Sequence, residues 1–396
     1  MRILLPYNQR IAGNSFYSDF HAGLAEAARE LGHTTVRFDH ADGSTVLATE
    51  REALYRLLTT LELDLVIDLC GWSHALSQQR AWDGTSEGEP LFDSFEMDYV
   101  AMLCDQPWFQ PLPEIRSARA HAAVPDRHHG EQIALIHPQL SLRSTLFAPP
   151  AGRLANDRSL GNNTNAKPID VLFVGNLYAE SLERPWAQAP DARLYDDMLD
   201  WLCAHPDLPL HHALREVAQA HRIDIDATQA TALLRSVEFC LRARGRMEAV
   251  RAAAASGAGM TVVGDGWTRI PLPANVTLHP FTDYEGFLGM AAQSKIGIDA
   301  STYRHGANDR VFNYTMNHCV CFTNARGFLG EAFGADGGLH FYSSASPASL
   351  GPAIRALLDA PARLREDAAR ARALTLQTQT WRHRLETIIA AVDAQP

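Results

Sequence analysis

Short apolar runs alternate with amphipathic segments along most of the chain, and this alternation restricts the fold more than any other feature. In the N-terminal part the apolar runs are residues 2–6, 35–38, 64–69 and 99–104, and the segment 16–31 between the first two has helical spacing. The run 64–69 is continuous enough for a strand that is buried on both faces. Alternating strands and helices predict a parallel sheet with helices on both of its faces.

The same alternation starts again after a polar segment at 149–167, whose proline, glycine and asparagine content is typical of a linker. Further apolar runs follow at residues 170–174, 259–263, 276–278, 295–299 and 319–322. A chain of 396 residues is long enough for two domains. We therefore predict an α/β domain at 1–166, a second at 167–375 with a helical insertion at about 191–256, and a last helical segment at 376–396.

Composition and missing motifs exclude several classes of function. The 46 acidic residues outnumber the 35 basic ones, so the chain lacks the basic surface that non-specific nucleic-acid binding requires. No segment reaches the roughly 18–20 apolar residues of a membrane span, and the N-terminus does not have the pattern of a signal peptide. We expect a cytoplasmic protein without a nucleic-acid partner. The dinucleotide and P-loop glycine motifs are both missing, which disfavours those two classes of enzyme.

Small and polar residues follow several of the predicted strands. Gly175 and Asn176 follow one strand, residues 264–267 (Gly-Asp-Gly-Trp) follow another, and the polar segment 305–314 leads from a third into a helix. Ligands of parallel sheets bind at the carboxyl ends of the strands, where glycine allows close approach and a helix N-terminus offers N–H groups to phosphate. The alternative is that these glycines only make turns.

Charged residues near these loops allow functional and structural interpretations. Arg310 lies at the start of a helix, where the helix dipole disfavours a cation, so an anion such as a diphosphate is expected beside it. An Arg–Asp pair that holds the loop is the alternative. Arg242 and Arg246 share one helix face, which we interpret as solvated. The Asp224–Asp226 spacing is interpreted as a solvated turn, so no metal site is predicted, and the pair at 128–129 (His-His) is interpreted as exposed.

The C-terminal half resembles the spore-maturation-type (CgeB-like) glycosyltransferases of the GT-B class. The resemblance covers about residues 168–390 and rests on the segments 170–176, 264–267, 294–298, 308–312 and 380–384. It implies two Rossmann-like domains with parallel sheets that face each other across a cleft, and a C-terminal helix that crosses back to the N-terminal domain. The C-terminal domain would hold the nucleotide-sugar donor and the N-terminal domain the acceptor.

The resemblance also implies a set of donor-site residues. They are Gly175, Asn176, Gly264, Asp265, Gly266, Trp267, His305, Gly306, Asn308, Asp309, Arg310 and Asn313. Arg310 would face the diphosphate. Many GT-B enzymes place a glutamate on this helix to bind the ribose, and Asn313 is the residue found there in this sequence.

An inverting transferase also needs a general base near the acceptor hydroxyl. The candidates follow the N-terminal strands: we favour Asp105, then His74, with Asn14 as a third. The predicted function is a metal-independent glycosyltransferase without a bound cofactor, which uses a nucleotide-diphosphate-sugar and a protein, glycan or small-molecule acceptor. Two alternatives stay open: a two-domain small-ligand binding protein without catalysis, and a GT-B-like sugar-nucleotide epimerase or hydrolase.

Overall fold

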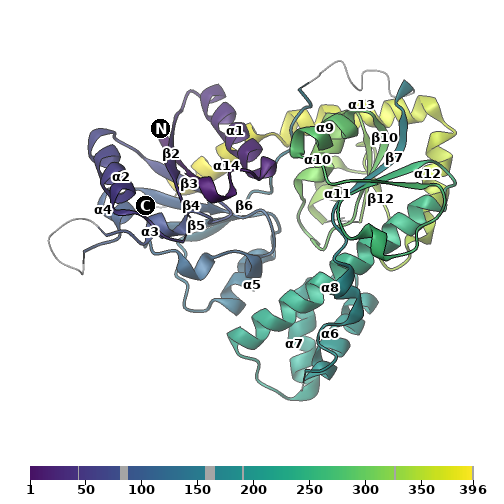
Figure 1. Cartoon of the computed structure of the whole chain (residues 1–396), viewed down its shortest axis with the longest axis horizontal. Helices are drawn as coiled ribbons and strands as arrows, with labels where there is room; N and C mark the ends of the chain where they lie inside the picture. Colours follow the sequence, from purple (N-terminus) through teal and green to yellow (C-terminus); the bar gives the residue numbers. More distant parts are fainter. Residues whose placement is uncertain (43, 81–87, 157–165, 190, 325–326, 395–396) are drawn as a thin grey trace. The chain divides into compact units, whose positions relative to one another are not determined.

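The computed structural model describes residues 1–42, 44–80, 88–156, 166–189, 191–324 and 327–394. The chain divides into two compact units, Met1–Pro150 with Trp381–Pro396 (unit 1) and Ala151–Thr380 (unit 2). Each unit contains a six-stranded sheet in which all paired strands are parallel, with helices packed around it (Figure 1). The predicted fold class, two Rossmann-like α/β sheets, is confirmed.

Unit 1 has the strand order β2-β1-β3-β4-β5-β6. Its strands are β1 (Arg2–Asn8), β2 (Thr34–His40), β3 (Leu65–Leu69), β4 (Asp98–Met102), β5 (Ala120–Val124) and β6 (Ser144–Phe147). Its helices are α1 (Ser15–Glu30), α2 (Ala48–Thr60), α3 (His74–Ser77), α4 (Leu91–Ser94), α5 (His129–Ile136) and α14 (Trp381–Asp393). Every residue of β3, β4 and β5 is buried, because helices cover both faces of the sheet centre.

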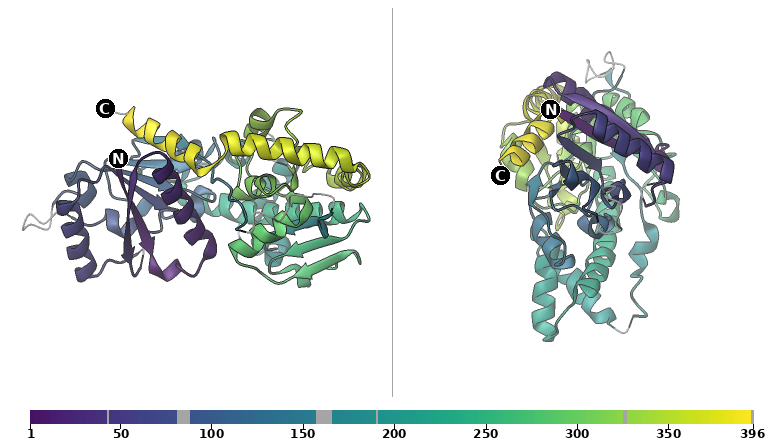
Figure 2. Two further views of the ribbon diagram at one scale, coloured as in Figure 1. Left: turned by 90° about the horizontal axis from the view of Figure 1, so that it is seen from above. Right: turned by 90° about the vertical axis from the view of Figure 1, so that its left-hand side faces the viewer.

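The last helix, α14, packs on α1 of unit 1 (Figure 2). The Trp381 ring meets Phe20 edge-on at 4.6 Å between centroids. It also lies directly over Gly23, where an added Cβ would come within 2.5 Å of the indole. Arg384 Nε donates to the carbonyl oxygen of Pro149 at 2.6 Å. The apolar stripe of this helix is therefore used in the core of unit 1, in agreement with the predicted fold class.

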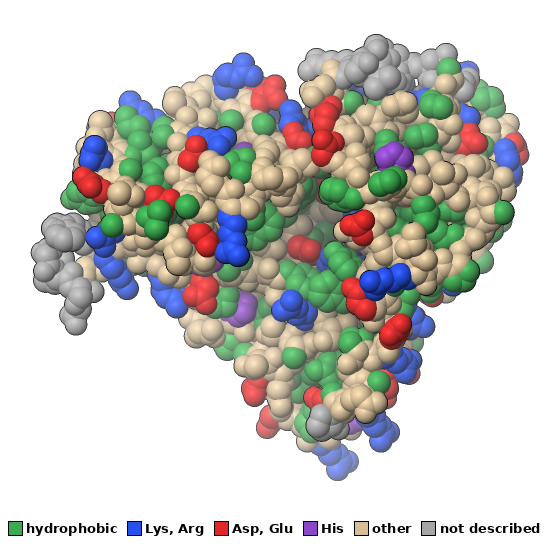
Figure 3. All heavy atoms as spheres, in the orientation of Figure 1, with side chains coloured by type: hydrophobic (Ala, Val, Ile, Leu, Met, Phe, Trp, Pro, Cys, Tyr) green, Lys and Arg blue, Asp and Glu red, His purple; other side chains and the backbone are tan. Residues whose placement is uncertain are grey.

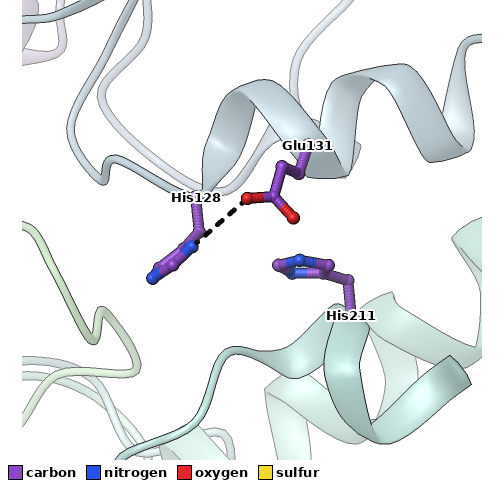
Figure 4. Close-up of side chains that lie close together, drawn as sticks. All are labelled: His128, Glu131 and His211. Carbon is purple, nitrogen blue, oxygen red and sulfur yellow. Dashed lines mark ion pairs between the residues drawn. The ribbon is translucent and has the colours of Figure 1, made fainter. Parts of the chain in front are cut away.

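The neighbouring histidines His128 and His129 differ from the prediction that both are exposed. His129 is buried because it shares one face of α5 with Gln132 and Ile133, which are three and four residues further on. His128 is half-buried, and its Nδ1 lies 3.8 Å from Oε1 of Glu131 (Figure 4). The adjacent positions of His128 and His129 in the sequence did not show which of the two faces the core, because this depends on where the helix begins.

A buried histidine in unit 1 is expected to make the protein less stable in acid. His21 is 6% exposed and packs edge-on against Tyr7 and Tyr17, with ring centroids 4.9 Å apart in both cases. Burial, together with the nearby Arg37, lowers the pKa of His21 to about 4. The unfolded chain therefore takes up a proton between pH 6.5 and 4 that the folded chain does not, so stability is lost as the pH falls through this range.

We expect His21→Phe to reduce this acid sensitivity. The shift corresponds to about 3 kcal/mol, which wild type should lose progressively between pH 6.5 and 4 relative to the variant. Urea unfolding followed at pH 7, 6, 5 and 4 measures the difference. The exposed His279, replaced by glutamine, is the control. A difference between wild type and His21→Phe that does not change with pH would contradict the prediction.

Unit 2 has the strand order β12-β11-β10-β7-β8-β9. Its strands are β7 (Ile169–Val174), β8 (Met260–Val263), β9 (Val276–His279), β10 (Ser294–Asp299), β11 (Val320–Thr323) and β12 (His340–Phe341). Its helices are α6 (Ala192–Ala204), α7 (Leu210–His221), α8 (Ala227–Ala254), α9 (Tyr284–Ala292), α10 (Asp309–Met316), α11 (Gly327–Phe333), α12 (Leu350–Leu358) and α13 (Pro361–Thr378). The order reverses at β7, which lies between β8 and β10, so the switch point where ligands of open sheets bind lies between β7 and β10.

The boundary between the units, Pro150–Ala151, lies near the start of the predicted linker at 149–167 and not at its end, where the domain boundary was predicted. Gly152 lies against α10, where an added Cβ would be 2.6 Å from the backbone of Phe312. Asn313 of α10 and Asn317, the residue that follows this helix, accept hydrogen bonds from this segment. Arg153 N donates to Asn313 and Ala155 N to Asn317, both at 2.8 Å. Residues 157–165 of the predicted linker lie outside the described residues. The predicted linker has the composition of a linker, but the side chains of Asn313 and Asn317 hold its first part in place.

The surface of the described chain is mixed in charge. On the face drawn in Figure 3, basic and acidic side chains are interspersed. None of the helices that the structure describes is both long and apolar enough to cross a bilayer.

Candidate functional site

Two loops at the carboxyl edge of the unit 2 sheet hold each other in place. Trp267 Nε1 donates to Gly175 O at 2.8 Å, and Asp265 N donates to Asn176 Oδ1 at 2.9 Å. Gly266 has φ +86°, and an added Cβ there would be 1.9 Å from Leu177 O. These predicted binding residues therefore have a structural function first, because they bring the loops after β7 and β8 together.

Gly264 also lies where the loop after β8 packs closely against the loop after β7. Its φ is +129°, and an added Cβ would be 2.7 Å from Gly175 O. The Trp267 ring is buried and meets Phe173 edge-on at 5.4 Å between centroids. Of the four residues 264–267, only Asp265 is exposed.

Two arginines meet at the backbone of Gly175. A Cβ added to this glycine would be 3.5 Å from Cζ of Arg246 and 3.5 Å from Nη1 of Arg310. Arg246 comes from α8 and Arg310 from the first turn of α10, so elements far apart in the sequence bring both guanidinium groups to the end of β7. This is the switch point of the sheet, and it is the strongest candidate for an anion site in unit 2.

Arg310 forms the Arg–Asp pair that the sequence left open as an alternative. Its Nε lies 3.3 Å from Oδ1 of Asp299, a fully buried carboxylate that also accepts from Asn308 and Thr323. Asn308 Oδ1 caps α10 by accepting from Arg310 N at 3.0 Å. Burial acts to lower the pKa of Arg310, but Asp299 and Asp309 outweigh it, and the pKa is raised. The side chain remains 20% exposed and fully charged.

Arg246 is buried, and the prediction that it lies on a solvated face is wrong. It is 6% exposed, and its Nη1 donates to Asn176 O at 2.5 Å. Within the part of the chain that the structure describes, its Nε has no hydrogen-bond partner and its guanidinium makes no ion pair with a carboxylate. Burial, followed by the nearby positive charge of Arg310, lowers the pKa of Arg246 to about 9. A buried cation is stable only with a counter-charge, which an anionic ligand would supply.

The helix phase of α8 could have revealed this position. Arg246 is three residues after Ala243 and three and four before Ala249 and Val250, and all three are fully buried. Arg246 thus lies on the apolar stripe of the helix. By contrast, Arg242 lies one turn earlier and pairs with the buried Glu238, Nε to Oε1, at 2.7 Å.

Asn313 is placed in the core rather than at an open surface. Its Nδ2 donates to Tyr284 Oη at 2.8 Å and to Asp309 Oδ2 at 2.9 Å, and its Oδ1 accepts from Arg153 N. Burial raises the pKa of Asp309, against the opposing effect of Arg310. The amide of Asn313 is therefore already used within unit 2, and the structure does not show it turned toward a ligand.

The loop between β10 and α10 contains the other two predicted residues. His305 is half-buried and Gly306 is buried. A Cβ added at Gly327 would be 2.6 Å from Nδ1 of His305, so the loop packs closely on the start of α11.

The metal-like spacing Asp224–Asp226 has a structural explanation, because Asp226 caps α8 by accepting from Gln229 N at 2.8 Å.

The three candidate bases follow strands of unit 1. Asn14 is exposed and caps α1, where its Oδ1 accepts from Phe16 N at 3.1 Å. Asp105 is half-buried, and its Oδ1 accepts from Gln106 N at 2.8 Å. His74 begins α3, and its Nδ1 lies 3.0 Å from Gly71 O, an oxygen that can only accept. Nδ1 therefore carries the proton, and Nε2 presents the lone pair that a general base requires.

A buried network supports the loop that carries His74. Ser73 N donates to the Asp68 carboxylate at 3.0 Å, and His40 Nε2 lies 2.8 Å from Ser73 Oγ. Tyr99 Oη also donates to Asp68. Burial raises the pKa of Asp68 to about 7, although these hydrogen bonds oppose the shift. The network was not found in the sequence, because its members come from three strands and one loop.

Comparison with known proteins agrees with this description. Residues 242–390 match a family model described as glycosyl transferase-like. No curated relative matches the chain in sequence. Among solved structures, an alpha-glucosyltransferase in complex with UDP has a TM-score of 0.57 at 10% identity over 99% of this chain and 100% of that one.

Two further solved structures match this chain over its whole length and over the whole length of their own chains. They are sucrose-phosphate synthase from Thermosynechococcus elongatus (TM-score 0.53, 11% identity) and Alr3699/HepE from Anabaena in complex with UDP and glucose (0.50, 11%). At these identities the likeness shows the fold alone, which is that of GT-B glycosyltransferases. Together with the family match of the C-terminal part, it confirms the predicted class of enzyme, a glycosyltransferase.

Proposed function

We propose that unit 2 binds a nucleoside-diphosphate sugar, with its diphosphate between Arg246 and Arg310 at the backbone of Gly175. The observation that carries the proposal is the meeting of a buried guanidinium group, Arg246, with a half-buried one, Arg310. Among the described residues Asp299 is the only carboxylate paired to either of them. UDP is the nucleotide we propose, because two of the similar structures contain it. Each of the two guanidinium groups is planar and can donate two parallel hydrogen bonds to the oxygens of a diphosphate.

The proposed chemistry follows from this charge. When the sugar is transferred, negative charge develops on the departing diphosphate, and two fixed guanidinium groups stabilise it without having to reorganise. Asp299 holds Arg310 in place, so one of the two cations is positioned before the donor binds. For this reason we propose a reaction that needs no bound metal.

We propose His74 as the general base for the acceptor hydroxyl, ahead of Asp105. His74 Nε2 has the free lone pair, whereas Asp105 already accepts from Gln106 N. The buried network around Asp68 and Ser73 fixes the loop that precedes His74, so this residue is a positioned base. Asn14 is used as a helix cap, which supports a structural function for it.

Several finer assignments are part of the same proposal. We propose a relationship with the spore-maturation-type (CgeB-like) glycosyltransferases, supported by the segment 308–312 around Arg310. The proposed acceptor is a hydroxyl or other nucleophile of a protein, glycan or small molecule. All six cysteines are free thiols, which supports a reducing, cytoplasmic location.

The release of free nucleoside diphosphate from UDP-, GDP- and dTDP-sugars, measured with and without cell extract, tests the proposed function. We expect turnover with a UDP-sugar that depends on extract as the source of acceptor. We also expect the rate to be unchanged in EDTA, because the guanidinium pair supplies the positive charge. Binding without turnover would favour a binding protein, and turnover without extract a hydrolase. Activity lost in EDTA and restored by Mg²⁺ or Mn²⁺ would disprove metal independence.

A further inference from the structure

A pocket of about 250 Å³ lies in unit 2, outside the guanidinium pair. Its walls come from the end of α6, one face of α8, and the loops that follow β10, β11 and β12. The residues that matter for its chemistry are Leu241, Arg244, Gly245, Glu248, Thr302 and Arg304. A single ring with its substituents fits a volume of this size. None of the three residues proposed to hold the diphosphate, Gly175, Arg246 and Arg310, lines this pocket.

Gly245 forms part of the pocket wall and has no packing reason to be glycine. It lies inside α8, a helix of 28 residues, where glycine costs about 0.5–1 kcal/mol relative to alanine. A Cβ added at Gly245 would meet no atom within 4 Å, so no neighbouring element needs the space. A ligand that lies against the backbone of α8 explains the missing side chain.

The charges beside Gly245 are not paired with each other. Arg244 and Glu248 are one turn apart on α8 and form no salt bridge, and the only hydrogen bond of the Arg244 side chain to a described residue goes to Cys203 Sγ at 3.8 Å. Arg304 Nε donates to Leu208 O at 3.3 Å. The Arg244 guanidinium therefore keeps its positive charge without an ion-pair partner among the described residues.

The rest of the lining is both polar and apolar. Ser301, Thr302, Asn324 and Ser344 contribute hydroxyl and amide groups, and Leu202, Pro206 and Leu241 contribute apolar surface. Rings with hydroxyl groups bind at such mixed surfaces, where a carboxylate accepts from hydroxyls and an arginine holds an anion.

We propose that this pocket binds a sugar acid, that is, a monosaccharide ring carrying one carboxylate. The ring lies on Gly245, Arg244 holds the carboxylate, and Glu248 accepts from ring hydroxyls. The assignment of the ligand as a sugar rests on the proposed function, whereas the pocket and its charge do not. The sugar acid is either the glycosyl group of the donor or a free acceptor.

The pocket and the proposed diphosphate site share helix α8, which carries Gly245 of the pocket and Arg246 of the diphosphate site. Thr302 lines the pocket and donates to Glu238 Oε1 at 2.7 Å, and Glu238 also binds Arg242. Gly245 precedes Arg246 in the sequence, so adjacent faces of one helix present the pocket and the guanidinium pair. A sugar acid in the pocket and a diphosphate at Arg246 would therefore be neighbours.

Calorimetric titration with D-glucuronate, D-glucose and UDP tests the proposal. We expect wild type to bind D-glucuronate at least tenfold more tightly than D-glucose, since only the acid pairs with Arg244. Gly245→Leu should abolish D-glucuronate binding and keep UDP binding, because the leucine side chain fills the pocket. Arg244→Ala should weaken D-glucuronate binding about tenfold.

Matched variants separate this effect from changes in folding. Gly289 of α9 is also a helical glycine with open space around it, so Gly289→Leu is the control for Gly245→Leu. Arg251 is an exposed arginine of α8, so Arg251→Ala is the control for Arg244→Ala. Both control variants should bind D-glucuronate like wild type. If Gly245→Leu does not fold, Gly245→Ala serves, since alanine suits a helix better and still reduces the space. D-glucuronate binding that is equal in wild type and the Gly245 variants would overturn the proposal.

The two sources of the sugar acid give different results. If the donor carries it, UDP-glucuronate binds more tightly than UDP-glucose, and Gly245→Leu removes this advantage. If it is the acceptor, free D-glucuronate binds the UDP-saturated protein and the two donors bind equally. Wild type that binds UDP but not D-glucuronate at millimolar concentration would refute this pocket assignment alone. Wild type that does not bind UDP would refute the proposed function instead.

Discussion

Replacing Arg246 by methionine is expected to weaken UDP binding by about 10- to 150-fold and to leave the protein at least as stable as wild type. The expected loss of binding free energy is that of one charge-assisted hydrogen bond to a diphosphate, about 1.5–3 kcal/mol. Stability is retained because the variant removes a buried cation that has no ion-pair partner among the described residues and that lies close to Arg310. Calorimetric titration of UDP and thermal unfolding measure the two effects.

Arg310→Ala provides the contrast. It should weaken UDP binding by a similar factor, but it should also destabilise unit 2, because Asp299 would stay buried without its cation. Arg310→Lys should recover only part of the binding, since an ammonium group lacks the planar fork. Arg251→Ala, an exposed arginine of α8, is the control. UDP affinity that is unchanged in Arg246→Met would disprove the diphosphate site.

Lys167→Met is expected to destabilise the protein by about 3 kcal/mol, because three backbone carbonyls lose their donor. The Lys167 ammonium group is buried and donates to Ser294 O at 3.0 Å, Asn317 O at 3.1 Å and His318 O at 2.7 Å. It thereby connects the start of β10 with the end of α10. Burial lowers the pKa of Lys167 to about 8, so the charge is costly unless these carbonyls surround it.

Lys295→Met is the matched control for Lys167. Lys295 forms a partly exposed pair with Asp170 at 2.6 Å, and such pairs contribute about 1 kcal/mol or less. Chemical denaturation followed by circular dichroism measures both variants. Equal losses of stability in the two would show that the buried ammonium group has no special structural value.

Arg310 and Arg246 show how far the sequence could predict the candidate site. Arg310 was found because its signals are local: a strand, a loop with asparagine and glycine, and an arginine in the first turn of a helix. The helix phase of Arg246 indicated a buried position, but its contacts could not be predicted, because Asn176 lies 70 residues earlier in the chain. Asn313 was assigned to a ligand, yet its partners are Tyr284, Asp309 and the backbone of Arg153.

The sequence by itself determined the repeated alternation of strand and helix, and with it the two parallel sheets. It also located the loops at the ends of the strands, because hydrophobic period and turn residues act over a few neighbouring positions. Only the tertiary structure decided which charged groups are buried, which are paired, and where the first unit ends. Desolvation and ion pairing depend on groups that lie close in space but far apart along the chain, as Lys167 and Arg246 both show.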